Sequence, residues 1–278
     1  MFKLCAIVTS YYPNLEELEQ NIRSYLSDVD KLIIWENTPK NESRINELVK
    51  KLNNEKIEVR TTGRNEYLAK PFNICIEWAK QNGYTHILTM DQDSCFAKYE
   101  FGAYKEKVAA LSKDESIAIF APTTNKTDQK EPDIIYINKG SVYTSGAIYR
   151  REMFDKIGGF REDFAIYCLD PEICIRARKN NYKVIKFPQI YMKHTEGYRT
   201  KKLGLTINNY SAQSTYFYIR NNILFWKIYP TDFQLSVKFN FIKYHVIYRI
   251  AKIGFEKNRT AKLKAIFLGI LHGIKMSV

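Results

Sequence analysis

Short apolar segments alternate with amphipathic ones along residues 4–91, and this alternation constrains the fold more than any other feature. Residues 4–10 read LCAIVTS, a continuous apolar run typical of a strand buried on both faces. Further strands are predicted at 31–35, 57–61 and 86–91. The segments between them repeat apolar residues on one helical face, after Pro13-Asn14, over 42–52 and over 71–80. Strands that alternate with helices indicate βαβ units and a mostly parallel, Rossmann-like α/β sheet.

The pattern weakens after residue 91 and changes character near residue 205. Later elements are expected as strands at 116–120 and 134–137 around a polar loop at 125–133, a helix after Thr144-Ser145-Gly146, a helix at 171–179 and a strand at 183–187. Beyond 205 the pattern is wholly helical and basic. We therefore predict an α/β domain over 1–204 and a helical C-terminal region over 205–278.

The excess of positive charge is concentrated in the tail of the 278-residue chain. Lys+Arg number 43 against 30 Asp+Glu, a net charge of +13. Residues 227–278 hold ten Lys+Arg and two Asp+Glu, and the other residues hold 33 and 28. A basic excess calls for an anionic partner, which is nucleic acid, a phosphate-bearing substrate or a membrane surface. The uneven distribution argues against a nucleic-acid binder with one continuous basic face.

Cysteine usage and targeting signals indicate a cytoplasmic protein. The five cysteines form no CxxC pair, which is typical of small buried side chains in a reducing compartment. The N-terminal segment lacks a signal-peptide cleavage pattern, and no uncharged apolar stretch approaches the roughly 20 residues that a membrane span needs.

Polar side chains gather where the predicted strands end: Thr9, Glu36, Arg64 and the run Asp91-Gln92-Asp93. In an open α/β sheet, ligands bind at this edge. Asp91 and Asp93 point to the same side if the backbone stays extended, and two such carboxylates suit a divalent cation that bridges two phosphates. A solvated turn explains the same Asp-x-Asp spacing, so both interpretations stay open.

Two further segments carry candidate chemistry. Asp170, Pro171 and Glu172 form a strong helix start, with Asp170 at the N-cap position. Asp170 is therefore either a cap alone or a general base. Capping would lower its pKa, whereas burial beside a substrate would raise it. His194 is either a structural histidine or the third ligand of a mixed oxygen and nitrogen site for Mn²⁺ or Mg²⁺.

Seven segments, in chain order, resemble the inverting family-2 glycosyltransferases with the GT-A fold, and most closely their rhamnosyltransferase-like branch, which builds bacterial surface polysaccharides. The segments read AIVTSYYPN, IIWENTP, LTMDQDS, TSGAIYRREMFDKIGGFREDF, LDPEICIRARKNNYKV, YFYIRNN and AIFLGILHGI. Glu36 stands where the family commonly has Asp, and Tyr167 stands where an acid often precedes the helix. The resemblance covers nearly the whole chain and implies a GT-A catalytic domain over 1–204.

The resemblance also implies roles for individual residues in transferring a sugar from a nucleotide diphosphate donor to an acceptor hydroxyl, with inversion. Asp170 would take the proton of the attacking hydroxyl. A divalent cation, Mn²⁺ or Mg²⁺, would be held by Asp93 and His194. The donor side comprises Thr9, Glu36, Arg64, Asp91, Gln92, Ser145 and Gly146, the glycine allowing close backbone approach. Glu172 and Arg176 would lie on the acceptor side.

The branch favours dTDP-rhamnose as donor, with UDP-hexose or UDP-galactofuranose as the alternative, and a lipid-linked glycan acceptor at the inner face of the cell membrane. A sugar-nucleotide nucleotidyltransferase would need a Gly-rich, basic phosphate loop near its N-terminus, and TSYYPN contains neither Gly nor Lys. A nucleic-acid-binding module is disfavoured by the mild charge of residues 1–226.

The tail repeats apolar residues at helical spacing beside basic ones. One predicted stripe comprises Val237, Phe241, Tyr244, Tyr248, Ala251 and Phe255, and a second comprises Leu263, Ile266, Phe267, Ile270 and Leu271. Basic amphipathic helices are typical of membrane-surface binding. Packing on the catalytic domain or a homo-oligomer interface would explain the stripes equally well.

Overall fold

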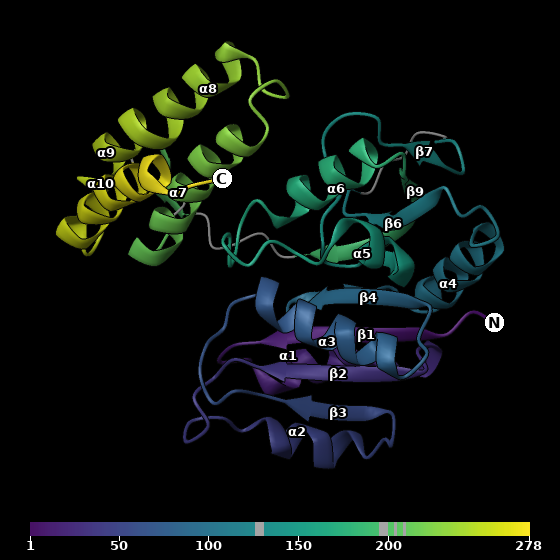
Figure 1. Cartoon of the computed structure of the whole chain (residues 1–278). Helices are drawn as coiled ribbons and strands as arrows, with labels where there is room; N and C mark the ends of the chain where they lie inside the picture. The colour runs from purple at the N-terminus through teal and green to yellow at the C-terminus, as the bar shows by residue number, and fades with distance from the viewer. Residues whose placement is uncertain (126–130, 195–199, 203–204, 208–209) are drawn as a thin grey trace. The chain divides into compact units, whose positions relative to one another are not determined.

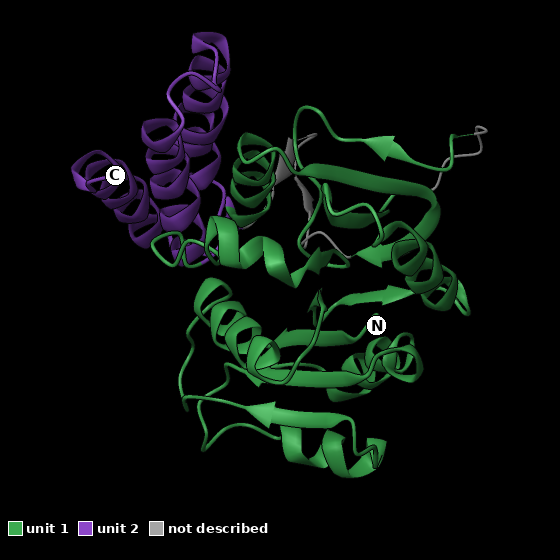
Figure 2. Cartoon of the chain, turned by 45° about the vertical axis from the view of Figure 1, so that its right-hand side comes forward, with its two compact units in different colours: residues 1–165, 169–195 green, residues 166–168, 196–278 purple. Residues whose placement is uncertain are grey.

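The computed structural model describes residues 1–125, 131–194, 200–202, 205–207 and 210–278, and it divides the chain into two compact units. The first unit comprises residues 1–165 and 169–195, and the second comprises residues 166–168 and 196–278 (Figure 2). The predicted boundary at residue 204 falls later than this division.

The predicted four-stranded parallel sheet is present in the first unit. Its strands are β3 (Ile57–Arg60), β2 (Lys31–Glu36), β1 (Leu4–Ser10) and β4 (His86–Asp91), and they pair in this order (Figure 1). In the register of the sheet, Thr9 lies between Trp35 and Asp91. The carboxyl ends of β1, β2 and β4 therefore meet at one edge, which is where the polar residues were predicted to gather.

The sheet continues beyond β4 with mixed pairing. The added strands are β8 (Ile148–Arg150), β6 (Ile117–Thr123), β9 (Lys183–His194), β5 (Ser94–Phe96) and β7 (Ile135–Tyr136). β8 is antiparallel to both neighbours, whereas β6 and β9 are parallel. The helix expected directly after Gly146 begins only at Arg151, because residues 148–150 first pair with β4 and β6. β9 is long enough to reach β5, so that His194 lies opposite Ser94.

Helices cover both faces of this sheet. They are α1 (Leu15–Arg23), η1 (Leu26–Asp28), α2 (Ile45–Leu52), α3 (Ala69–Gln81), α4 (Glu100–Leu111), α5 (Arg151–Ile157) and α6 (Leu169–Lys179). Alternate residues of β1, namely Leu4, Ala6 and Val8, share one buried cluster with side chains of α1, α2 and α4. α3 lies on the opposite face (Figure 1). Strands buried on both faces explain the continuous apolar run that the sequence shows.

The second unit is mainly helical. It contains the strands β10 (Thr200–Lys202) and β11 (Leu205–Ile207), followed by α7 (Ala212–Ile228), α8 (Leu235–Phe241), the π-helical segment η2 (Ile242–Ile247), α9 (Tyr248–Ile253) and α10 (Arg259–Lys275). The expectation of a wholly helical region beyond 205 is wrong, because β11 pairs antiparallel with β10. α7 and α10 pack closely, with Gly269 and Gly273 of α10 against backbone carbonyls of α7.

The predicted apolar stripe of the tail is largely exposed on this unit. Val237, Tyr244, Tyr248 and Phe255 are each more than two-fifths exposed. The π-helical turn of η2 interrupts the 3.6-residue repeat between α8 and α9, so the stripe does not stay on one line. Within the described residues, none of the helices combines the length and the hydropathy that crossing a bilayer would require.

Candidate active site

Asp91, Asp93 and His194 converge at the edge of the sheet. Each offers a ligand atom, and these atoms lie within 4.8 Å of one another. Asp91 ends β4, Asp93 lies in the following turn, and His194 ends β9, a hundred residues later. The sequence predicted Asp93 and His194 as ligands. The structure brings Asp91, which the resemblance placed on the donor side, into the same group, as the Asp-x-Asp spacing had allowed.

A chain of hydrogen bonds holds this group in place. The Asp91 amide donates to Ser145 Oγ at 3.0 Å, and the Ser145 hydroxyl donates to Ser94 Oγ at 2.8 Å. Ser94 Oγ lies 2.8 Å from Nδ1 of His194. Ser145, predicted to face the donor, therefore supports the ligands. Ser94 was not predicted, although its place directly after Asp93 in the DQDS motif is the signal that could have identified it.

The electrostatics of the three residues suit a divalent cation. Burial, together with the charges of Asp93 and Asp170, raises the pKa of Asp91 to about 7. Burial also raises the pKa of Asp93, against the lowering effect of His194. Among the described residues, the buried Oδ1 of Asp93 has no hydrogen-bond partner. Two carboxylates and an imidazole form a donor set suited to Mn²⁺ or Mg²⁺, which confirms the prediction of a divalent-cation site.

Asp170 lies in the first turn of α6, and burial governs its ionisation. The helix begins at Leu169, so the prediction of Asp170 as the N-cap is wrong. Its Oδ1 accepts a hydrogen bond from the Thr144 amide at 2.7 Å. Burial raises the pKa of Asp170 above its ordinary value, although the bonds from Thr144 and the charge of His194 oppose the rise. A carboxylate with a raised pKa is a stronger base than an exposed one.

The residues after β1 and β2 line a pocket of about 470 Å³. The pocket is lined by Tyr12, Pro13, Asn14, Leu15, Glu16, Thr38, Glu42, Ser43 and Arg44. Glu36 is buried behind this lining, where it accepts hydrogen bonds from the Thr38 amide at 2.7 Å and the Ser43 hydroxyl at 3.0 Å. Glu36 therefore shapes the pocket wall through Thr38 and Ser43.

Three other predicted donor residues have different surroundings. Gln92 fastens the turn after β4 to the end of β1, since its Oε1 accepts from the Tyr11 amide at 2.7 Å. Thr9 is buried in the sheet. Arg64 is largely exposed and pairs with Glu66, and it is not among the residues that line the pocket.

Comparisons with known proteins agree with this geometry. No protein-family model matches the chain. The dTDP-rhamnosyl transferase RfbF of Shigella flexneri is 25% identical over 292 residues, which cover 97% of this chain and 95% of RfbF. The structure of GalNAc-T7 with UDP, GalNAc and Mn²⁺ has a TM-score of 0.58 at 14% identity, covering 88% of this chain and 54% of that one. The Pyrobaculum calidifontis mannosyltransferase PcManGT, with GDP-Man and Mn²⁺, has a TM-score of 0.57 at 12% identity, covering 99% of this chain and 76% of that one.

The chain has the GT-A glycosyltransferase fold and is similar to a rhamnosyltransferase over nearly its whole length. The fold comparisons establish the GT-A sheet, and the relative from Shigella flexneri supports the rhamnosyltransferase-like branch that the motifs predicted.

Gly146, predicted to allow close approach of the donor, packs tightly against other side chains of the protein. Its φ of +81° suits glycine, and a Cβ there would lie 2.5 Å from the Met192 sulfur and 2.9 Å from Pro122. Its amide donates to the Thr89 carbonyl, and its carbonyl accepts from Tyr104. The glycine therefore makes room for the side chains of Met192 and Pro122, and close approach of the donor at this position stays a prediction.

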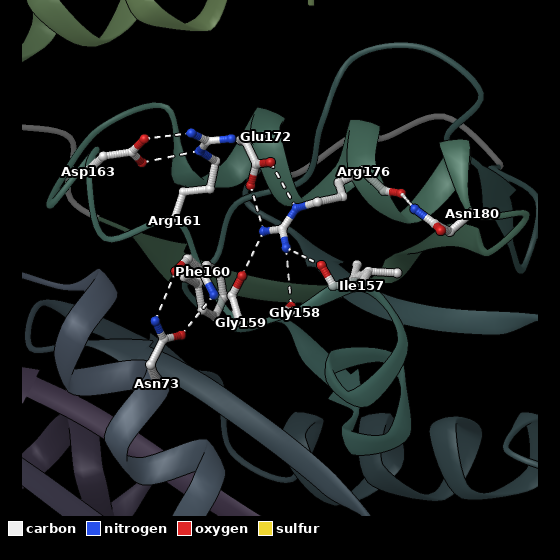
Figure 3. A network of polar contacts seen from close by, with 10 residues as sticks. All are labelled: Asn73, Ile157, Gly158, Gly159, Phe160, Arg161, Asp163, Glu172, Arg176 and Asn180. Carbon is white, nitrogen blue, oxygen red and sulfur yellow. Dashed lines mark hydrogen bonds and ion pairs between the residues drawn. The ribbon is translucent and has the colours of Figure 1, made fainter. Parts of the chain in front are cut away.

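Glu172 and Arg176, which the resemblance placed on the acceptor side, bind each other in an internal clamp. Glu172 is fully buried and binds the Arg176 guanidinium through both oxygens, each at 2.8 Å. The guanidinium also donates to the carbonyls of Ile157, Gly158 and Gly159 (Figure 3). The clamp ties the first two turns of α6 to the end of α5 and so holds the part of the helix that carries Asp170.

Proposed function

We propose that this glycosyltransferase moves a sugar from a nucleotide diphosphate donor to an acceptor hydroxyl with inversion, in its first unit. The proposal rests on one observation. A buried carboxylate with a raised pKa, Asp170, is electrostatically coupled to the ligand group of Asp91, Asp93 and His194. The chain thus pairs a base with a place for the cation of a diphosphate, as inverting transfer requires.

In this proposal Asp170 accepts the proton of the acceptor hydroxyl while that oxygen forms its bond to the anomeric carbon. The bond from the anomeric carbon to the diphosphate breaks on the opposite side, and the diphosphate leaves with the electron pair. A divalent cation held by Asp91, Asp93 and His194 would neutralise the charge of the diphosphate. Ser94 and Ser145 keep these ligands oriented through their hydrogen bonds.

For the donor we propose dTDP-rhamnose, with UDP-hexose or UDP-galactofuranose as the alternative. The similarity to the dTDP-rhamnosyl transferase of Shigella flexneri supports the first, and the similarity to GalNAc-T7 with UDP and to Staphylococcus aureus TarS with UDP-GlcNAc supports the second. TarS residues 1–349 have a TM-score of 0.51 at 16% identity, covering 80% of this chain and 66% of that one. The pocket beside Glu36 is the proposed place of the base.

A panel of donors tests the function directly. The full chain with Mn²⁺ is incubated with dTDP-rhamnose, UDP-galactose, UDP-galactofuranose or GDP-mannose, and release of the nucleoside diphosphate is measured with and without a glycan acceptor. We expect release from dTDP-rhamnose that depends on the metal. Release from none of the four donors, combined with no thermal stabilisation by any of them, would contradict the proposed function.

For the acceptor we propose a lipid-linked glycan, reached from the cytoplasmic face of the membrane through the basic second unit. Exposed apolar side chains on α8 and η2, including Leu235, Phe239 and Ile247, support this proposal, as do the exposed lysines Lys243, Lys257 and Lys264. A homo-oligomer interface would use the same side chains. Liposome binding and the oligomeric state in solution distinguish a membrane surface from such an interface.

A further inference from the structure

Residues 166–168 link the base-bearing helix to the second unit, and we call this tripeptide the strap. It precedes Leu169 and Asp170 directly, yet it groups with residues 196–278 and not with the sheet (Figure 2). The residue before the strap, Ala165, belongs to the first unit, where its carbonyl accepts bonds from the Leu68 and Ala69 amides at the start of α3. The backbone therefore leaves the first unit for three residues and returns at the start of α6.

The strap and the residue before it have an unfavourable backbone conformation. Ala165, Tyr167 and Cys168 have φ values of +59°, +64° and +61°, in the left-handed region that favours glycine. This conformation is sterically unfavourable for residues with a Cβ, and it persists only where surrounding contacts hold it. Three left-handed residues within four positions need a strong external constraint.

Asn221 of α7 supplies that constraint. Its Nδ2 donates to the carbonyls of Ile166 at 2.5 Å and Tyr167 at 3.3 Å, and the residue is completely buried. Its Oδ1 accepts from Nε of Arg220 at 2.8 Å, which orients the amide so that the nitrogen faces the strap. The ring of Tyr167 also packs edge-on against Tyr218 of the same helix, with centroids 5.8 Å apart. One amide group thus satisfies two consecutive carbonyls of a strained backbone.

We propose that Asn221 is a positioning residue for Asp170, and this inference rests on the proposed function. Asp170 follows the strap after one residue, so the place of its carboxylate depends on where the strap ends. On the other side, the first turn of α6 is held by the Thr144 amide and by the Glu172–Arg176 clamp. Loss of the Asn221 bonds would leave the helix folded but would release its first turn at the strap.

Two substitutions of Asn221 and one of its neighbour test the proposal. Asn221→Asp keeps the shape and the acceptor for Arg220 but removes the donor to the strap, and Asn221→Ala removes both. Asn222→Ala is the matched control, because the Asn222 amide donates within α7, to the Tyr218 carbonyl at 2.8 Å. We expect kcat to fall about 100-fold in both Asn221 variants, since small misplacement of a reacting group costs about that much. The donor KM should change less than about twofold, and the control should retain the wild-type kcat.

Hydrogen exchange gives a second readout that does not depend on activity. The amides of residues 165–170 should exchange faster in both Asn221 variants and at the wild-type rate in Asn222→Ala, while β1 and β4 keep their protection. Wild-type kcat and exchange in Asn221→Asp would overturn the inference. An equal loss of kcat in Asn222→Ala, or a matching rise in donor KM, would also overturn it. A wild-type protein inactive on every donor would instead contradict the proposed function, and the exchange data would still test the strap.

Discussion

At the scale of single residues, two features of Asp170 have opposite effects on its pKa. It accepts a hydrogen bond from the Thr144 amide, which stabilises the carboxylate, and it is buried, which destabilises it. Burial prevails, so the pKa of Asp170 lies above the ordinary value for aspartate. The sequence indicated both effects but not which of them determines the pKa of Asp170. Burial depends on segments that lie far from Asp170 in the sequence.

Replacement of Asp170 by asparagine tests its role as the base. A carboxamide cannot accept the proton, so we expect Asp170→Asn to lower kcat by about 10²–10⁴-fold while donor affinity stays within a few fold. In the wild type, kcat should fall as the pH drops through the raised pKa of Asp170, because only the ionised carboxylate is a base. Steady-state kinetics over a pH series measures both effects. Normal turnover by the asparagine variant, or a flat pH profile on the acid side, would rule out Asp170 as the base.

Asp93 is the ligand with the unpartnered buried oxygen, which makes it the most direct test of the cation site among the residues that the structure describes. We expect Asp93→Ala to lose at least about tenfold in metal-dependent donor affinity, because one of three ligands and its charge are gone. Calorimetric titration of the donor with and without Mn²⁺ measures this loss. Asp163→Ala is a suitable control, since that aspartate pairs with Arg161 and is not one of the three ligand residues. Equal donor affinity in the two variants would contradict the role of Asp93.

Much of the candidate site could be predicted from residues close together in the sequence, and the errors involve distant partners. The Asp91-Gln92-Asp93 motif and Asp170 were identified from local patterns and a family resemblance. The packing of Gly146 could not be predicted, because Met192, which lies against it, comes from β9. The bonds of Asn221 to the strap could not be predicted, because the two carbonyls that it binds lie more than fifty residues away.

At the scale of elements, the Glu172–Arg176 clamp should contribute far more than its sequence spacing suggests. Its side chains are 0% and 17% exposed, whereas the similarly bidentate pair of Glu47 and Arg44 is 57% and 70% exposed. Arg176→Ala removes a positive charge that is paired with a buried carboxylate, together with the hydrogen bonds to three carbonyls, so we expect a loss of about 3–5 kcal/mol in unfolding free energy. Arg44→Ala should cost about 0–1 kcal/mol. Chemical denaturation of both variants measures the difference, and similar losses would show that the clamp is not structural.

The contact of α10 with α7 depends on small residues. A Cβ at Gly273 would lie 2.9 Å from the Arg220 carbonyl and 2.9 Å from Ile223, so we expect Gly273→Ala to destabilise the second unit by about 1–3 kcal/mol. Gly102→Ala in α4 is the control, because its nearest neighbour would be 3.5 Å away and alanine favours the helix by about 0.5–1 kcal/mol. Thermal unfolding monitored by circular dichroism compares them. Equal stability of the two variants would contradict the close packing of α7 and α10.

The elements that were predicted well have a strong signal in their own residues. All four strands of the parallel sheet were predicted within one residue of their bounds, because each is a short apolar run between helices. β8 and β11 were missed, since three residues carry too little periodicity to reveal a strand whose existence depends on its partners. The π-helical turn of η2 also has no local signal in the sequence.

At the scale of the whole molecule, the concentration of positive charge in residues 227–278 predicts binding to anionic membranes. We expect the full chain to sediment with liposomes that contain anionic lipid and to release at high salt. A triple substitution of Lys243, Lys257 and Lys264 by Gln should weaken binding by about fivefold for each lysine, as about 1 kcal/mol per basic residue predicts.

A charge-matched variant controls this experiment. Lys40, Lys98 and Lys113 are exposed lysines of the first unit, and their triple replacement by Gln removes the same charge. That variant should bind liposomes as the wild type does. Equal weakening in both variants would point to net charge alone. Absence of liposome binding together with a dimer in solution would favour the homo-oligomer interface for the tail.

The strap also bears on how this enzyme can be taken apart. A cut at any single peptide bond cannot separate the two units as intact pieces, because the second unit includes three residues that lie between α5 and α6. A shortened chain without α7 would retain every proposed ligand and the base, and would still lose the partner of residues 166 and 167. Chimeric proteins that exchange the helices of the second unit between relatives should therefore exchange the strap with them. The segment to exchange in such a chimera is therefore discontinuous in the gene, since it comprises residues 166–168 and 196–278.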